Sequence, residues 1–208
     1  MSEVDFKTEQ EIFWAGDFGN EYIDRNKGSD KVISNIGLFC DILRNTEKIK
    51  SVIEFGANIG LNLKVIKSIL PNAEFHGIEI NRKAYEILKE WGGGKAYHQS
   101  ILDFKSKIKF DFVYTKGVLI HINPDQLSRV YESLYHSSKK YICIIEYYNP
   151  KPVEVPYRRH RNKLFKRDFA GEMLDKYDDL NIESYGFVYH RDKLFPQDDL
   201  TWFLLKKK

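Results

Sequence analysis

Apolar positions along this chain fall into two patterns. Five short segments bounded by turn residues are predicted to be strands: residues 51–55, 75–80, 95–99, 110–115 and 140–148. After Gly60, Asn81 and Asn123, apolar residues recur at helical spacing, which predicts a helix in each place. Strands that alternate with helices indicate an α/β fold with a largely parallel sheet, and such sheets bind ligands at the carboxyl ends of their strands.

The C-terminal part of the chain follows a different pattern. A helix is predicted over about 169–177, and two strands follow over about 181–190 and 199–206 with no helix between them. Consecutive strands without a crossover helix pair antiparallel, so we expect a hairpin at the edge of the sheet. Together these strands form a seven-stranded, Rossmann-like sheet in a single domain over residues 1–208, in which residues 1–45 are an N-terminal lid or helical segment.

The turn after the first strand indicates the ligand. Gly56 and Gly60 let the backbone turn sharply and approach a ligand where a Cβ would collide. Asn58 replaces the middle glycine of many such turns, and asparagine tolerates a positive φ better than most residues. Glu54, just before the first glycine, would repel a pyrophosphate but suits an ammonium group. This favours S-adenosylmethionine, whose methionyl part carries an amine, over NAD or FAD.

Two further acids follow strand ends. Glu79 lies about 20 residues beyond the glycine turn, where a carboxylate can accept hydrogen bonds from both ribose hydroxyls. Asp103, after the third strand, is placed to meet the adenine amino group. The alternative is that Glu54 is a charge at a helix start and the other two are solvated loop acids, but three acids on successive strand ends favour a cofactor site. Three neighbours are assigned to the same site: Asn62, Ile80 and Leu102.

Composition bounds the class of protein. The chain is 42% hydrophobic and 14% aromatic, which fits a packed globular protein, and its net charge of +3 does not demand a nucleic-acid partner. No apolar run approaches the roughly 20 residues that a membrane span needs, and the polar N-terminus is unlike a signal peptide. Cys143 lies in an apolar strand and is expected to be a core thiol. We therefore expect a cytoplasmic protein, and no metal site, because no cysteine or histidine has ligand spacing.

Several blocks of this chain resemble one family. The segment Phe13–Asn26 looks like the opening signature of the pseudaminic acid biosynthesis-associated methylases, which are class I S-adenosylmethionine-dependent methyltransferases. Residues 54–62, 115–123 and 165–172 are similar to that family's other blocks, so the resemblance runs from about residue 11 to the C-terminus. It implies a methyltransferase sheet, S-adenosylmethionine as cofactor, and a nonulosonic acid or amino-sugar intermediate of surface-glycan biosynthesis as acceptor.

The segment from Trp14 to Asn26 precedes the first strand and is dense in aromatic and hydrogen-bonding side chains. We interpret it as a lid helix over the cofactor, because methyl transfer requires that water be excluded. Trp14 and Tyr22 would cover apolar surface, and Arg25 would pair with the methionyl carboxylate through a bidentate fork. The alternative is an ordinary amphipathic helix that covers the sheet.

Candidate catalytic groups follow the fourth and fifth strands. His121 titrates near neutral pH and is a candidate general base or positioning group for an acceptor hydroxyl. The alternative is a histidine packed at a helix entrance. Lys116 is assigned to the cofactor pocket or to an acidic substrate, with a surface lysine as the alternative. Tyr147 is a second candidate catalytic residue, and Tyr148 a candidate for the acceptor pocket.

A basic segment points to the acceptor. Residues 151–167 carry seven lysines and arginines against a single acid, Glu154. A nonulosonic acid has a carboxylate and its nucleotide-activated form adds a phosphate, and both suit arginine. We therefore assign Tyr157, Arg158 and Arg161 to binding of a small anionic sugar, with a solvated basic loop as the alternative.

Three rival functions are disfavoured. A nucleic-acid methyltransferase could use the basic segment, but the fourth strand lacks an Asn-Pro-Pro-Tyr-like motif for a flipped base and no RNA-binding domain is added. The intact set of three acids together with His121 argues against a binding or regulatory protein that has kept the cofactor pocket without catalysis. Glu54 and the terminal hairpin argue against an NAD-dependent oxidoreductase. Another small metabolite as acceptor, O- against N-methylation and the oligomeric state stay open.

Overall fold

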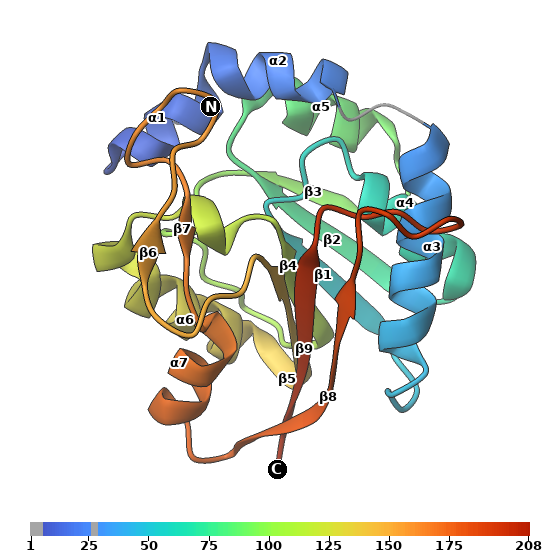
Figure 1. The fold of residues 1–208 in the computed structure, drawn as a ribbon. Helices are drawn as coiled ribbons and strands as arrows, with labels where there is room; N and C mark the ends of the chain where they lie inside the picture. Colours follow the sequence, from blue (N-terminus) through green and yellow to red (C-terminus); the bar gives the residue numbers. More distant parts are fainter. Residues whose placement is uncertain (1–5, 26–28) are drawn as a thin grey trace.

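Helices pack on both faces of a seven-stranded sheet in a computed structural model that describes residues 6–25 and 29–208 (Figure 1). Residues 1–5 and 26–28, which the predicted N-terminal segment 1–45 includes, lie outside the described residues. The strands are β1 (Ser51–Phe55), β2 (Glu74–Glu79), β3 (Lys95–His98), β4 (Phe110–Lys116), β5 (Ser138–Glu146), β8 (Leu180–Val188) and β9 (Leu200–Lys207). Their order across the sheet is β3-β2-β1-β4-β5-β9-β8.

Strand direction follows the predicted connections. Strands β1 to β5 pair in parallel, whereas β9 is antiparallel to both β5 and β8. The predicted Rossmann-like sheet with a C-terminal antiparallel hairpin is therefore confirmed. No helix within the described residues is long and apolar enough to cross a membrane.

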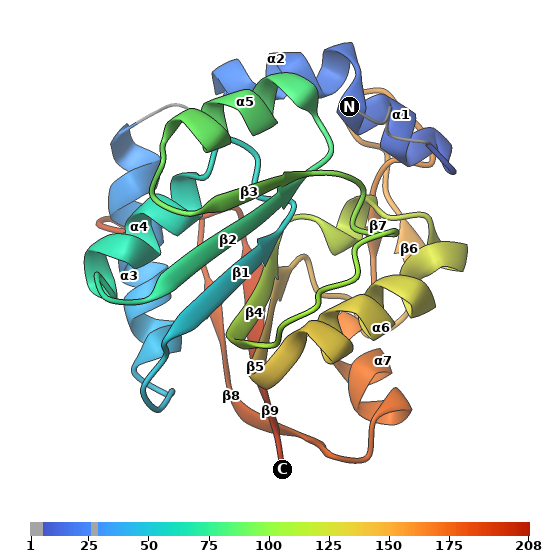
Figure 2. The same ribbon diagram turned by 180° about the vertical axis from the view of Figure 1, so that it is seen from behind.

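Two layers of helices cover the sheet. Helices α3 (Ser29–Leu43), α4 (Leu61–Ile69) and α5 (Arg82–Glu90) pack on one face, and α6 (Leu127–Ser137) and α7 (Phe169–Lys176) on the other, as the view from behind also shows (Figure 2). A short 3-10 helix, Pro124–Gln126, precedes α6 and another, Leu119–His121, follows β4.

Residues of the central strands alternate between two hydrophobic cores. In β1, Val52 packs in the core beneath α3, α4 and α5, and Ile53 in the core beneath α6 and α7. Strands β4 and β5 are buried along nearly their whole length, and Cys143 of β5 is a buried free thiol, as predicted. Strands that are buried on both faces carry continuous apolar runs, which is why the sequence marked them clearly.

The predicted lid helix is two helices, α1 (Glu9–Ala15) and α2 (Asp17–Arg25), which lie across one end of the sheet (Figures 1 and 2). Thr8 starts α1 because its side chain accepts the N–H of Glu11, whose own carboxylate accepts the N–H of Thr8. Gly16 ends α1 with an extended backbone, φ −91° and ψ −152°, so the chain turns before α2 begins.

A small hairpin in the basic segment was not predicted. Strands β6 (Val153–Glu154) and β7 (Phe165–Lys166) pair antiparallel, and we call residues 153–166 the flap. The flap lies beside α1, where Gln10 Nε2 donates to the carbonyl of Asn162 at 2.9 Å and Lys163 pairs with Glu9 at 3.1 Å. It follows β5, which ends at Glu146 and not at Tyr148 as predicted.

Candidate functional site

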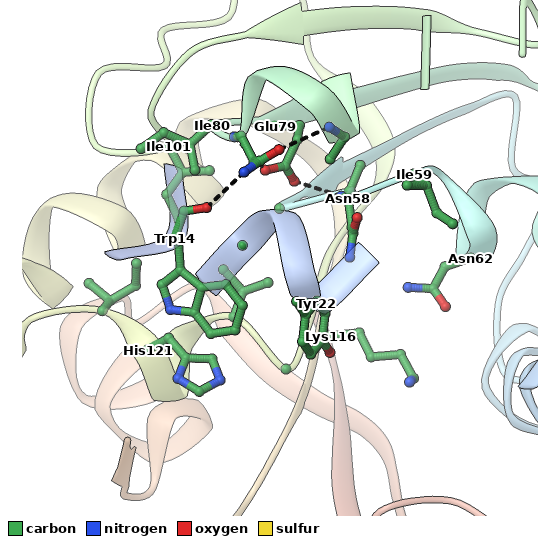
Figure 3. Close-up of a pocket in the computed structure, with 18 of the residues that line it drawn as sticks. Trp14, Tyr22, Asn58, Ile59, Asn62, Glu79, Ile80, Ile101, Lys116 and His121 are labelled. Carbon is green, nitrogen blue, oxygen red and sulfur yellow. Dashed lines mark hydrogen bonds between the residues drawn. The ribbon is translucent and has the colours of Figure 1, made fainter. Parts of the chain in front are cut away.

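A cavity of about 370 Å³ lies at the carboxyl ends of β1, β2 and β4, next to α1 and α2 (Figure 3). Ten residues assigned to function from the sequence line it: Trp14, Tyr22, Gly56, Asn58, Asn62, Glu79, Ile80, Leu102, Lys116 and His121. Nine others do not: Arg25, Glu54, Gly60, Asp103, Tyr147, Tyr148, Tyr157, Arg158 and Arg161. The individual roles of these residues stay predictions, and their surroundings are described in turn below.

The glycine turn has the backbone that its sequence predicts. Gly56, Asn58 and Gly60 all have positive φ, at 79°, 47° and 75°. A Cβ on Gly56 would lie 2.6 Å from Val118 Cγ2, so a larger residue would collide there even without the unfavourable φ. The turn therefore depends on glycine at both ends and on asparagine in the middle, where we expected a tolerated positive φ.

Glu79 is held in a fixed orientation at the end of β2. Its carboxylate accepts the backbone N–H groups of Asn58 at 2.6 Å and of Asn81 at 2.7 Å. Burial raises its pKa, while these N–H donors act in the opposite direction. Figure 3 shows the hydrogen bond from Asn58 to Glu79 in the cavity wall. The side chain is thus a preorganised acceptor at the cavity.

Glu54 lies beneath the cavity wall and not in it. Its side chain points to the face of the sheet covered by α4, and Asn62 Nδ2 donates to its Oε1 at 2.6 Å. Burial raises the pKa of Glu54 to about 8. Direct contact with a methionyl ammonium is therefore not supported by this geometry, because Asn62 stands between the carboxylate and the cavity.

Two polar residues that sequence reasoning missed extend this contact. Asn35 Nδ2 donates to Asn62 Oδ1 at 2.8 Å, and Gln197 Nε2 donates to Asn35 Oδ1 at 2.9 Å. Both Asn35 and Gln197 line the cavity. Since 162 positions separate them, no local signal in the sequence could have paired them.

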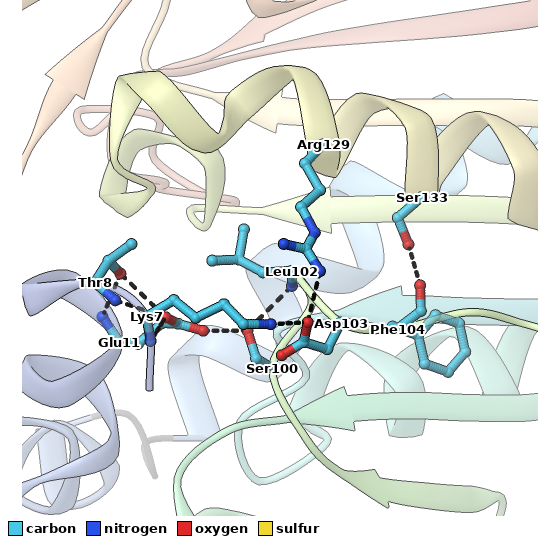
Figure 4. A network of polar contacts seen from close by, with 9 residues as sticks. All are labelled: Lys7, Thr8, Glu11, Ser100, Leu102, Asp103, Phe104, Arg129 and Ser133. Atoms are coloured by element: carbon cyan, nitrogen blue, oxygen red, sulfur yellow. Dashed lines mark hydrogen bonds and ion pairs between the residues drawn. The ribbon is translucent and has the colours of Figure 1, made fainter. Parts of the chain in front are cut away.

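Asp103 contacts two cations outside the cavity, so the geometry does not support its predicted place beside adenine. Its carboxylate pairs with Arg129 of α6 at 2.7 Å and with Lys7, which precedes α1 (Figure 4). Beside it, the Ser100 hydroxyl donates to the Glu11 carboxylate of α1. Residues 100–103 therefore hold α1 in place through these polar contacts. Three of them, Ser100, Ile101 and Leu102, also line the cavity.

Asn81 caps two helices at once. Its Oδ1 accepts the N–H of Ala84, which confirms the predicted cap of α5. Its Nδ2 donates to the carbonyls of Trp14 and Ala15, each at 3.2 Å, and to Asn20 Oδ1 at 3.0 Å. The same residue therefore joins the start of α5 to the end of α1.

Arg25 lies on α2 away from the cavity. Its guanidinium carbon is 5.0 Å from the centre of the Phe18 ring, and its Nη1 lies 3.5 Å from Glu21. Lys116, at the end of β4, does line the cavity, and burial lowers its pKa. Of these two cations, only Lys116 is placed to contact a carboxylate in the cavity.

His121 is buried in the cavity wall with a defined tautomer. Its Nδ1 lies 2.5 Å from the carbonyl oxygen of Lys163, and a carbonyl can only accept, so Nδ1 carries the proton and Nε2 is left as an acceptor. Burial lowers its pKa to about 4, which makes the ring neutral at pH 7. The Trp14 ring is 4.5 Å away and the Tyr157 ring 4.9 Å away, centre to centre.

Glu146, at the end of β5, fixes the turn that carries His121. Its carboxylate accepts the N–H groups of Val118 and Leu119, each at 3.0 Å. Burial nevertheless raises its pKa to about 7. Glu146 falls within the fifth strand predicted over residues 140–148, and the sequence did not indicate this supporting role.

The remaining assigned residues lie on or near the flap. Lys166 sits 4.8 Å from the centre of the Tyr147 ring, and Tyr148 is exposed beside Phe203. Arg158 and Arg161 are exposed on the flap. Among the described residues, no cluster of histidine, cysteine, aspartate or glutamate has the geometry to hold a metal ion.

Comparison with known proteins identifies the fold class. No family model matches the chain, and no curated protein matches it in sequence. Among solved structures, magnesium protoporphyrin IX methyltransferase (ChlM) from Synechocystis PCC 6803 with bound S-adenosylhomocysteine (SAH) is similar, with 11% identity and a TM-score of 0.67 over 95% of this chain and 98% of that chain. The plantazolicin methyltransferase BpumL with SAH and a desmethyl analogue has 14% identity and a TM-score of 0.66 over 96% and 97%.

A third similar structure has a less specific description. It is an S-adenosylmethionine-dependent methyltransferase from Clostridium acetobutylicum ATCC 824, with 12% identity and a TM-score of 0.65 over 91% of this chain and 97% of that chain. At these identities the likeness establishes architecture. The chain has the fold of the class I S-adenosylmethionine-dependent methyltransferases.

The raised pKa of Glu146 predicts that stability falls as pH rises from about 5 to 7. Between the ordinary value of 4.5 and the folded value of about 7, the folded protein keeps a proton that the unfolded chain has lost, so raising the pH favours unfolding. Glu146→Gln should flatten this slope by on the order of 1 kcal/mol per pH unit, measured by urea unfolding across that range. Glu54 has a shift of the same sign and keeps part of the slope.

The matched control is Glu90→Gln, which changes an exposed glutamate at the end of α5. It should leave the slope as in the wild type. An equal slope in the Glu146→Gln and wild-type proteins would contradict the assignment of a buried, protonated Glu146.

Proposed function

We propose that this protein is an S-adenosylmethionine-dependent methyltransferase and that its acceptor is a small anionic sugar. The observation that carries the proposal is Glu79, a buried carboxylate fixed by two backbone N–H groups at the end of β2, in the same cavity as the glycine turn and Lys116. The whole chain, residues 1–208, acts as one domain in the cytoplasm.

The cavity residues fit the parts of this cofactor in sequence. Glu79 accepts hydrogen bonds from the ribose hydroxyls. The adenine is enclosed by Ile80, Ile101 and Leu102. Lys116 pairs with the methionyl carboxylate. Asn58 Oδ1 is buried without a hydrogen-bond partner among the described residues, so the cavity offers an acceptor that a ligand donor can satisfy.

The amine of the cofactor is recognised through Asn62. Its Nδ2 donates to the Glu54 carboxyl group and its Oδ1 accepts from Asn35, so the amide is held in one orientation. The contact of Glu54 with Asn62 replaces the direct contact that the sequence suggested for Glu54, and the second lone pair of Asn62 Oδ1 can accept a hydrogen bond from the ammonium group.

The cofactor supplies an electrophilic methyl group on a sulfonium, and the protein must position the acceptor and exclude water. His121 Nε2 accepts a hydrogen bond from the acceptor hydroxyl or amine and so orients its lone pair. Because its pKa is about 4, this histidine is suited to positioning more than to holding the released proton. Trp14 and Tyr157 pack beside it and keep water from the reacting atoms.

The acceptor is a nonulosonic acid of the pseudaminic type or an amino-sugar intermediate of surface-glycan biosynthesis. Support comes from the resemblance of residues 13–26 and 115–123 to the pseudaminic acid biosynthesis-associated methylases, and from the basic flap beside the cavity. The similar structures are named as methyltransferases of magnesium protoporphyrin IX and of plantazolicin. Because proteins with this fold act on such different acceptors, the fold does not identify the acceptor of this protein.

A mass-spectrometric methyl-transfer assay tests the proposal. The acceptors are pseudaminic acid, its nucleotide-activated form, their amino-sugar precursors and bulk RNA, each with S-adenosylmethionine. Gain of one methyl group on a nonulosonic compound supports the proposal, and fragmentation locates the methylated atom. Methylation of RNA alone, or no binding of SAH, would overturn it.

Glu79 and Asp103 were both predicted to contact the adenosine part of the cofactor. Substitutions at the two positions should change SAH affinity by different amounts, because Glu79 lines the cavity and Asp103 does not. Glu79→Gln should weaken SAH binding at least about tenfold, because one carboxyl oxygen is replaced by an NH2 group that cannot accept a hydrogen bond. Asp103→Asn should change it by less than about threefold, since it breaks partly exposed ion pairs. Isothermal titration calorimetry measures both, and equal losses would show that Asp103 also acts on the cofactor.

Replacement of His121 should affect turnover without affecting cofactor binding. His121→Ala should lower kcat at least about tenfold because the acceptor loses its hydrogen-bond partner, with SAH affinity within twofold of wild type. Since the pKa of His121 is about 4, kcat should show no fall from its protonation between about pH 8 and 5.5. Near-normal turnover in His121→Ala would remove this residue from the mechanism.

A further inference from the structure

The tip of the flap is a two-residue hairpin turn made of Arg158 and Arg159. The N–H of Tyr157 donates to the His160 carbonyl at 2.9 Å, and the N–H of His160 donates to the Tyr157 carbonyl at 2.8 Å. The φ angles of the two arginines are 47° and 71°, so both lie in the left-handed region, as a type I′ turn requires. Asparagine and glycine are favoured at these two positions, and consecutive arginines there are strained.

The arginines of the tip lack acidic partners. Arg158, Arg159 and the neighbouring Arg161 are exposed, and no carboxylate among residues 6–25 and 29–208 lies within ion-pair distance of them. Two other cations of this region are paired, since Lys163 contacts Glu9 at 3.1 Å and Arg167 contacts Glu172 at 2.6 Å. The positive charge of the tip is therefore left for a ligand.

The tip is anchored beside the His121 end of the cavity. The guanidinium carbon of Arg158 lies 6.0 Å from the centre of the Tyr157 ring, and that ring lies 4.9 Å from the ring of His121. The His160 ring packs 5.0 Å from the Phe13 ring of α1, edge to face. Aromatic contacts on both sides of the turn thus fix the arginines next to the part of the site assigned to the acceptor.

We propose that Arg158 and Arg159 form an anion site that holds a phosphate group of the acceptor. The inference rests on the proposed function and narrows the acceptor to a phosphate ester, either a nucleotide-activated sugar or a sugar phosphate. Guanidinium groups bind phosphate oxygens in a bidentate fork, and two adjacent ones match a phosphate dianion better than they match a single carboxylate. Strain at both positions fits residues that are placed for binding and not for the stability of the turn.

The test replaces the two arginines by the residues that the turn prefers. Arg158→Asn combined with Arg159→Gly removes both charges and relieves the strain, so the variant should fold and its Tm should rise by about 3 °C. A control variant, Lys107→Asn with Lys109→Asn, removes the same charge just before β4, at the opposite end of that strand from Lys116. SAH should bind both variants with wild-type affinity.

Binding of defined probes to the SAH complex is then measured by calorimetry. The probes are CMP-N-acetylneuraminic acid, free N-acetylneuraminic acid and glucose 1-phosphate. The Arg158→Asn, Arg159→Gly variant should lose at least about tenfold in affinity for the two phosphate-bearing probes and less than about threefold for the free acid. The lysine control should bind all three as the wild type does. Equal losses of affinity for both phosphate probes would indicate that the arginines recognise the phosphate group alone. A loss of affinity for the CMP sugar only would indicate that the acceptor is nucleotide-activated.

Three results would overturn the anion site. The first is wild-type affinity of the arginine variant for the phosphate probes. The second is a loss of affinity for these probes in the lysine control that equals the loss in the arginine variant. The third is an arginine variant that loses affinity for a short single-stranded RNA but for no sugar phosphate. Failure of the proposed function is separately visible, because it would appear in the wild type as absent SAH binding. A methyltransferase whose acceptor KM is unchanged in the arginine variant would refute the anion site alone.

Discussion

The hydrogen bonds that the Glu79 carboxylate accepts from Asn58 and Asn81 hold the site together. One of them joins the ends of β1 and β2, and the other fixes the residue that caps both α5 and the end of α1. Through these hydrogen bonds, the carboxyl group of Glu79 positions the glycine turn, the start of α5 and, by way of Asn81, the end of α1. The same hydrogen bonds fix the orientation of the carboxyl group. The preorganised ligand acceptor and the docking of the N-terminal helices thus both depend on one buried carboxyl group.

A second set of contacts organises the acceptor end. Glu146 holds the turn before His121, and the Lys163 carbonyl holds the ring of His121 in one tautomer. Since Lys163 also pairs with Glu9 of α1, the histidine, the flap and α1 are linked through a few polar contacts. The cofactor end and the acceptor end therefore both contact the same N-terminal helix, the first through Trp14 and Ala15 at its end and the second through Glu9 at its start.

Local sequence signals predicted the sheet, the terminal hairpin and the glycine turn, because each follows from apolar runs, strand connections or backbone dihedrals. Contacts between distant residues were beyond such signals. The position of Asp103 after a strand predicted that it lies beside the adenine. In the structure its carboxylate forms ion pairs with Lys7 and Arg129 outside the cavity. Glu54 was placed in the cavity, but strand alternation turns its side chain toward α4, where Asn62 meets it. The flap was missed because its strands are two residues long and show no alternation.

The hydrogen-bonded series Gln197, Asn35, Asn62 and Glu54 has a direction. Gln197 donates to Asn35, and Asn35 and Asn62 each accept from the preceding residue and donate to the next, so reversing any one amide would set two oxygens or two NH2 groups against each other. The four side chains consequently behave as one unit with a single permitted polarity. A loop near the C-terminus, the helices α3 and α4 and the first strand are therefore coupled, because replacing any one of these side chains by an apolar residue would leave a polar atom of its neighbour without its hydrogen-bond partner.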